Sequence, residues 1–165
     1  MALPVTTVST SVFVQRMVHA ALILSLGIYA VVFRVAFATQ PPNPALASTM
    51  FPALAAVSLV QLVLVIPLLR RKMMPARAEA TSFTDVAGAQ VTPTAAAALA
   101  GYTRVQIVSW ALCESVAMFG FVLSVLTIDF RYYIGFAVAA LLNLILYRPS
   151  RDVAEAVARA ADRGA

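Results

Sequence analysis

The chain has 165 residues, of which 62% are hydrophobic and 12% are charged, whereas an ordinary soluble domain carries about a quarter charged residues. A soluble chain of this length must cover much of its surface with polar groups, and this sequence holds too few of them. The formal net charge is +5, but no basic stripe interleaved with aromatic residues follows the pattern of a nucleic-acid-binding protein. The composition therefore predicts an integral protein of the lipid bilayer that binds no nucleic acid.

Four apolar stretches are long enough, or nearly so, to cross a bilayer as helices, which takes about 20 residues. They are residues 16–37, 51–69, 105–127 and 132–147. The last stretch is short, and tilt or local thinning of the bilayer would accommodate it. The sequence thus predicts an all-α fold in which residues 1–149 form a bundle of four transmembrane helices.

The first stretch also has some features of a secretory signal peptide. Arg16 precedes its apolar run, and Ala36-Phe37-Ala38 resembles a small-x-small cleavage site. The apolar run is longer than that of a usual signal peptide, and Arg34 interrupts its end. We therefore expect the first helix to be retained.

The positions of the basic residues predict the orientation of the bundle. Basic residues of a membrane protein accumulate in its cytoplasmic segments. Ten of the twelve Lys and Arg side chains fall before the first span, between the second and third, or after the fourth. The two on the opposite side are Arg34 and Arg131. This distribution predicts a protein of the cell inner (plasma) membrane with both termini in the cytoplasm.

Two cytoplasmic segments carry helix signals of their own. The long connection, residues 70–104, contains Thr92 followed by Pro93, which is typical of an N-cap with proline at the first helical position. The third helix should therefore begin before the membrane and extend into the cytoplasm. Residues 150–165 follow Pro149 and place Glu155 four positions before Arg159, which predicts a short amphipathic helix as a cytoplasmic tail.

Small residues predict where the helices touch, because helix association in lipid depends on close approach of the backbones. The third span carries a stripe of five small residues: Ser109, Cys113, Ala117, Gly120 and Ser124. The fourth span carries a matching stripe: Gly135, Ala139 and Asn143. The turn between the two spans is so short that they must be antiparallel neighbours.

Glu114 is the residue that suggests a function. It lies nine positions after Val105, about 13 Å into the membrane and close to its midplane. A charge at that depth costs roughly 2.5 to 3.5 kcal/mol on insertion scales, and such residues mark ion paths, proton relays or ligand sites. Because a low-dielectric medium disfavours the ionised carboxylate, we expect a neutral Glu114 that exchanges a proton when exposed.

Two other polar residues are candidate members of the same proton or ion site. Asn143 lies within about one helical turn of Glu114 in depth, and Gln61 lies in the middle of the second span. The alternative is a packing role, in which a protonated Glu114 donates a hydrogen bond to Asn143, to Gln61 or to a backbone carbonyl.

The sequence around Glu114, QIVSWALCESVAMFGFVLSVL, resembles the carboxylate-bearing second helix of the proteolipid (c) subunits of rotary ATPases. The resemblance covers residues 106–126 and is carried by these positions: Ala111, Leu112, Glu114, Ala117, Met118, Phe119, Gly120, Val122 and Leu123. It implies that Glu114 binds and releases a translocated proton or cation. The glycine-rich helix that precedes the acid in that family has no counterpart between Phe51 and Leu69.

The sequence contains no nucleotide-binding loop, nucleophile triad or metal-ligand cluster, so we expect neither an enzyme nor a cofactor. Three functions remain open. The chain is an accessory subunit of a larger inner-membrane complex, or a proton- or cation-translocating carrier or channel subunit that acts through Glu114, or a free-standing structural membrane protein. The partners expected are lipid and either other membrane subunits or further copies of the chain.

Overall fold

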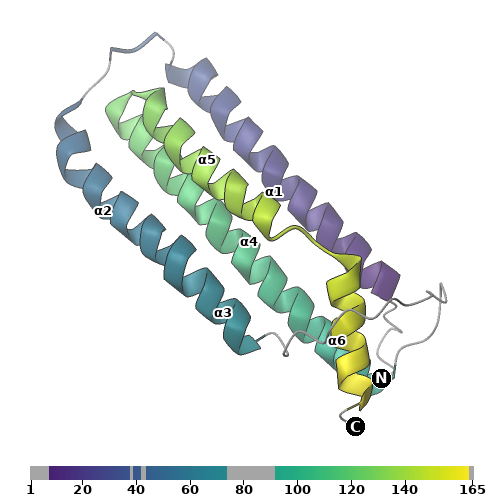
Figure 1. Ribbon diagram of the computed structural model, residues 1–165. Coiled ribbons are helices and arrows are strands. Elements are labelled where there is room, and N and C mark those ends of the chain that lie inside the picture. Colours follow the sequence, from purple (N-terminus) through teal and green to yellow (C-terminus); the bar gives the residue numbers. More distant parts are fainter. Residues whose placement is uncertain (1–7, 38, 42–43, 74–91, 164–165) are drawn as a thin grey trace.

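The computed structural model describes residues 8–37, 39–41, 44–73 and 92–163, and the regular structure in these ranges is helical. Its elements in chain order are α1 (Val8–Phe37), η1 (Pro44–Leu46), α2 (Ala47–Val60), η2 (Gln61–Val65), α3 (Ile66–Met73), α4 (Pro93–Thr127), α5 (Phe130–Leu146) and α6 (Arg151–Arg163). The long helices run side by side in an elongated bundle, and α6 lies at one end of it (Figure 1).

Three helical segments are long and apolar enough to cross a membrane: Val8–Phe37, Ala47–Arg71 and Pro93–Thr127. α5 and α6 together make a further candidate, broken by a bend of 52°. An all-helical protein with three or four apolar candidate spans is therefore confirmed. The first helix is longer than predicted, beginning at Val8 and not at residue 16, because Ser11 and Gln15 are buried there, with side chains hydrogen-bonded to Thr103 of α4.

The predicted start of the third long helix is confirmed. Thr92 is the N-cap of α4, and its hydroxyl accepts a hydrogen bond of 3.2 Å from the backbone N–H of Ala95. Pro93 occupies the first helical position, and α4 continues without interruption through Gly101. The predicted connection is thus helical from Pro93 onward, and its residues 74–91 lie outside the described part of the chain.

The predicted tail helix is also present, and it packs against its own chain. α6 contacts both α4 and α1. Their contact is an apolar cluster at the end of the bundle: Val12, Ala95, Leu99, Tyr102, Ala154, Val157 and Ala158. In addition, the Thr92 hydroxyl donates to the carboxylate of Asp162. The N-terminal turns of α4 and the tail helix α6 therefore bury their apolar faces against each other.

α4 is the central helix, and two of its small residues, Gly120 and Ser124, contact α5 directly. All five members of the predicted α4 stripe, residues 109, 113, 117, 120 and 124, are buried. A Cβ atom added to Gly120 would lie 2.5 Å from the Cβ of Phe136. Glycine allows this close approach, because a side chain at this position would collide with Phe136 unless α5 moved away.

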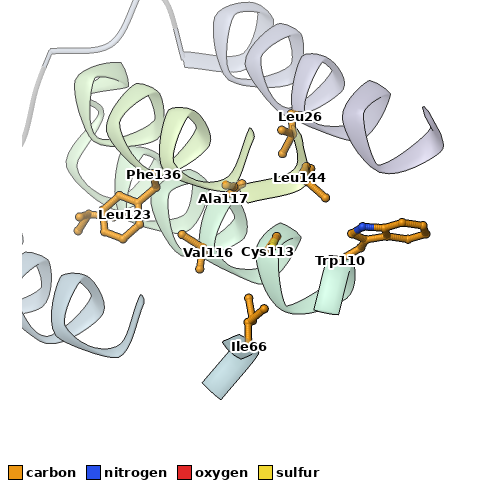
Figure 2. Close-up of a cluster of buried hydrophobic side chains, with 10 residues drawn as sticks. Leu26, Ile66, Trp110, Cys113, Val116, Ala117, Leu123, Phe136 and Leu144 are labelled. Carbon is orange, nitrogen blue, oxygen red and sulfur yellow. The ribbon is translucent and has the colours of Figure 1, made fainter. Parts of the chain in front are cut away.

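The contact face of α5 is not the predicted one. Gly135 is exposed, and a Cβ added to it would meet nothing within 4 Å. The buried positions of α5 are instead Tyr133, Phe136, Ala140 and Leu144. Phe136, Ala140 and Leu144 belong to the main apolar core, to which α1, α3, α4 and α5 all contribute (Figure 2). The error arises because Gly120 of α4 packs against the large side chain of Phe136, and not against a small residue of α5.

The second candidate span contains a π-helical turn, η2, in which the N–H of Ile66 donates to the carbonyl of Gln61 five residues earlier. Pro67 lies two residues after the end of this turn. A proline ring inside a helix collides with the carbonyl four residues before it and offers no N–H. The wider π-turn gives that ring room, and it is a usual way for a helix to absorb such an interruption.

Candidate functional site

Glu114 lies between α4 and α1, where two hydroxyl groups of α1 reach the same carboxyl oxygen. The Ser25 Oγ is 2.6 Å from Oε1 of Glu114, and the Tyr29 hydroxyl is 3.0 Å from that oxygen. Ser25 and Tyr29 are four residues apart, so they share one face of α1. The Glu114 side chain is half-buried. We refer to Ser25, Tyr29 and Glu114 as the carboxyl–hydroxyl cluster.

The serine of this cluster faces two acceptors. Its Oγ is 2.7 Å from the carbonyl oxygen of Leu22, one turn earlier in α1, as well as 2.6 Å from Glu114 Oε1. A serine hydroxyl has a single hydrogen to donate and can also accept. Both distances are those of good hydrogen bonds.

Aromatic packing fixes the position of the tyrosine. The ring of Tyr29 packs on that of Phe121, with 5.4 Å between centroids, and Phe121 in turn meets the edge of Tyr133. The Tyr133 hydroxyl donates to the carbonyl of Leu26 in α1. These contacts tie α1 to α4 and α5 next to the cluster and hold the Tyr29 hydroxyl at Glu114.

The cluster lies deep in the apolar part of α4. Glu114 precedes the last residue of the helix, Thr127, by thirteen positions, which is about 20 Å along the axis. Among the residues that the structure describes, no basic side chain forms an ion pair with Glu114. Its neighbours in the cluster are neutral hydroxyl groups.

The structure separates the three polar residues that the sequence suggested as one site. Gln61 faces another side of α4, where its Nε2 donates to the carbonyl of Leu112 (2.8 Å) and to Oγ of Ser115 (2.6 Å). The Asn143 amide donates to the carbonyl of Ala139 in its own helix, at 3.0 Å. Asn143 and Gln61 therefore satisfy their amides elsewhere, and the expected pairing with Glu114 is replaced by the two hydroxyls of α1.

Ser25 and Tyr29 were missed at the sequence level, although a weak signal was present. Both are polar residues at helical i,i+4 spacing inside an otherwise apolar span. The short turn between α4 and α5 fixes their register, so the sequence gives the depth of Glu114 relative to residues of α5. The rotation of α1 about its axis has no such local signal.

Two residues with metal-binding side chains are engaged in packing. The imidazole Nε2 of His19 is 2.9 Å from the carbonyl oxygen of Leu144, and its ring packs against Trp110 at 5.1 Å. Cys113 is a buried free thiol in the core. In the described residues no group of three or more His, Cys, Asp or Glu side chains could hold a metal ion.

Comparisons with models of protein families, with curated proteins and with solved structures give no match for this chain.

Proposed function

We propose that this protein is a small multi-pass subunit of a larger complex of the cell inner membrane, and that its Glu114 carries a proton in the middle of the bilayer. In this proposal α1, the α2–α3 segment, α4 and α5 each cross the membrane once, with both termini in the cytoplasm. Ten of the twelve basic residues then lie on the cytoplasmic side, as the positive-inside rule requires.

The observation that carries the proposal is the position of the Ser25 hydroxyl between two acceptors. With an ionised Glu114, the single Ser25 hydrogen can lie in only one of the two contacts, that with the Leu22 carbonyl at 2.7 Å or that with the carboxylate at 2.6 Å. The other would be a short contact between two oxygens with no hydrogen between them. A hydrogen on Oε1 removes this conflict. Glu114 then donates to Ser25 Oγ, the Ser25 hydroxyl donates to Leu22, and the Tyr29 hydroxyl donates to Oε1.

The environment favours the same protonation state. A lone carboxylate in hydrocarbon is costly unless a cation or several donors compensate it. The cluster offers two hydroxyls and, among the described residues, no ion-pair partner. Neutral Glu114 keeps its hydrogen bonds at a much lower desolvation cost.

The assignment as a subunit rests on a groove on the outside of the bundle. Between the second span and α4 there is an open space of about 610 Å³, lined mainly by apolar side chains of both helices. Gln61 and Ser115, already hydrogen-bonded to each other, lie at its wall. A neighbouring membrane helix would fill this groove and shield the polar pair from lipid.

A second candidate function is transfer of a proton or cation through Glu114. It is favoured by the half-buried state of the side chain, which leaves the carboxyl within reach of an exchanging partner. In that case the hydroxyls of Ser25 and Tyr29 hold the acid in place between exchange events.

Carbodiimide labelling tests the protonation of Glu114. A hydrophobic carbodiimide reacts with protonated carboxyl groups in apolar surroundings, so membranes containing the full chain should give a singly labelled protein at neutral pH. Glu114→Gln should abolish the label. Glu155→Gln is the matched control, because Glu155 lies in α6 in an ion pair of 2.8 Å with Arg151, and the label should persist. Labelling that survives Glu114→Gln would contradict the assignment.

Native gel electrophoresis after mild detergent extraction tests the assignment as a subunit. The protein should migrate with a complex much larger than a few copies of a 17.5 kDa chain. Glu114→Gln then separates the two candidates. A Glu114→Gln variant that still assembles but has lost ion movement supports transfer. A wild-type protein that migrates at the size of a monomer would favour a free-standing membrane protein.

A further inference from the structure

Arg70, near the end of α3, is held in a fixed position against α4 and α5. Its Nη1 donates to Oε1 of Gln106 at 2.6 Å, and its guanidinium lies over the ring of Tyr147, 4.4 Å from the centroid. A guanidinium that stacks on an aromatic face and is hydrogen-bonded at one edge has a fixed orientation, so its remaining N–H donors point in fixed directions.

The group that holds Arg70 is itself rigid. Gln106 is fully buried, and its Nε2 donates to the carbonyl of Tyr147 at 2.7 Å. The indole N–H of Trp110 donates to the same carbonyl at 2.8 Å. Carbonyl groups at a helix C-terminus lack partners within the helix, and these two side chains satisfy one of them at the end of α5. Arg70 is thereby fixed to the end of α5 by a buried amide.

The positive charge of Arg70 has no negative counterpart in the described part of the chain, where no carboxylate forms an ion pair with it. Two further basic residues are adjacent in sequence to the members of this contact. Arg148 follows Tyr147, Arg71 follows Arg70, and both are exposed. The site therefore combines a fixed, half-buried guanidinium with exposed basic residues next to its members in the sequence.

The site also lies at the edge of the apolar zone. The candidate span Ala47–Arg71 ends beside Arg70, and α5 ends at Leu146, just before Tyr147. If the α2–α3 segment and α5 cross as proposed above, phospholipid phosphates lie at this depth, immediately outside the hydrocarbon. A planar guanidinium is suited to bind two phosphate oxygens at once.

We infer that Arg70, with Arg148 beside it, binds the phosphate of an anionic phospholipid headgroup at this end of the bundle. The free edge of the Arg70 guanidinium donates to the phosphate oxygens, and the charge of Arg148 adds attraction from the exposed side. The acyl chains extend along the apolar surface of the bundle. This site rests on the proposed crossing of the membrane by the α2–α3 segment and α5, but it is separate from the carboxyl–hydroxyl cluster and does not depend on the proposed role of Glu114.

The test is native mass spectrometry of the full chain, purified in mild detergent and titrated with phosphatidylglycerol or with phosphatidylcholine. The wild type should retain phosphatidylglycerol more tightly. Arg70→Gln should weaken that binding about fivefold or more, since a basic residue near an anionic lipid surface contributes about 1 kcal/mol. Arg34→Gln is the matched control. Arg34 also stacks on an aromatic ring, that of Phe130 at 5.2 Å, but it lies near the C-terminal end of α1 and has no counterpart of the buried Gln106 amide.

Two further measurements keep the result decisive. If Arg70→Gln does not fold, Arg148→Gln replaces it, because that exposed side chain can be neutralised without disturbing the buried amide, and it should also weaken phosphatidylglycerol binding. Inorganic phosphate is added as a competitor and should displace little lipid. The inference would be overturned if the wild type retained the two lipids equally, or if phosphatidylglycerol binding were unchanged in both Arg70→Gln and Arg148→Gln. It would also be overturned if Arg34→Gln lost as much phosphatidylglycerol binding, or if inorganic phosphate displaced the lipid fully.

Discussion

Substitution of Gly120 by alanine should destabilise the bundle, because the added methyl group collides with α5. The new Cβ would lie 2.5 Å from the Cβ and 2.9 Å from the Cγ of Phe136, whereas ordinary contacts begin near 3.4 Å. Since one of the atoms it meets is the Cβ of Phe136, next to the backbone, α5 itself must move by nearly 1 Å. Overpacking of this kind costs about 1 to 3 kcal/mol, and the better helix propensity of alanine returns about 0.5 to 1 kcal/mol.

Taking the middle of each range, about 2 kcal/mol lost and about 0.75 kcal/mol returned, the net expectation is a loss of about 1.2 kcal/mol in the free energy of unfolding. It can be measured by titrating the detergent-solubilised protein with a denaturing detergent and following helicity by circular dichroism. Gly135→Ala and Gly101→Ala are matched controls, since a Cβ at either position meets nothing within 4 Å. These controls should be neutral or slightly stabilised. A Gly120→Ala variant as stable as the wild type, or an equal loss in Gly135→Ala, would refute the contact between α4 and α5 described above.

Further substitutions test other contacts. Ser25→Ala and Tyr29→Phe should each lower the free energy of unfolding by about 0.6 kcal/mol, the average for hydrogen bonds between membrane helices, and unchanged stability in both would argue against the cluster. Thr92→Ala removes the N-cap of α4 and should lower the stability of that helix end by about 1 kcal/mol. Proteolysis should then cut the N-terminal turns of α4 faster than in the wild type. An equal cutting rate would count against the cap. Gln61→Leu should leave carbodiimide labelling of Glu114 unchanged, because Gln61 bonds to another side of α4, and a lost label would place Gln61 in the acid's environment.

The helices themselves could be predicted because their signals are local. Apolar length marks a span, and the Thr92-Pro93 pair marks the start of α4 wherever the rest of the chain lies. The short tail helix likewise follows from the break at Pro149 and the pattern after it. The unpredicted π-turn at Gln61 has its local cause in Pro67, but the sequence does not distinguish a π-turn from a kink.

The partners of Glu114 could not be predicted because they depend on how α1 is rotated and placed. Ser25 and Tyr29 are separated from Glu114 by more than eighty residues, and no short turn fixes the register between α1 and α4. The face of α5 was mispredicted for a related reason. A stripe of small residues on α4 shows that something approaches closely, but not whether the approaching group is a small residue or the ring of Phe136.

Infrared spectroscopy of the full chain in lipid nanodiscs tests the central claim most directly, because a protonated carboxylic acid in apolar surroundings has a carbonyl stretching band of its own. The wild-type spectrum minus the Glu114→Gln spectrum at neutral pH should contain this band. The frequency of the band should shift when the sample is exchanged into heavy water. A difference spectrum that shows only the bands of an ionised carboxylate would contradict a proton on Glu114.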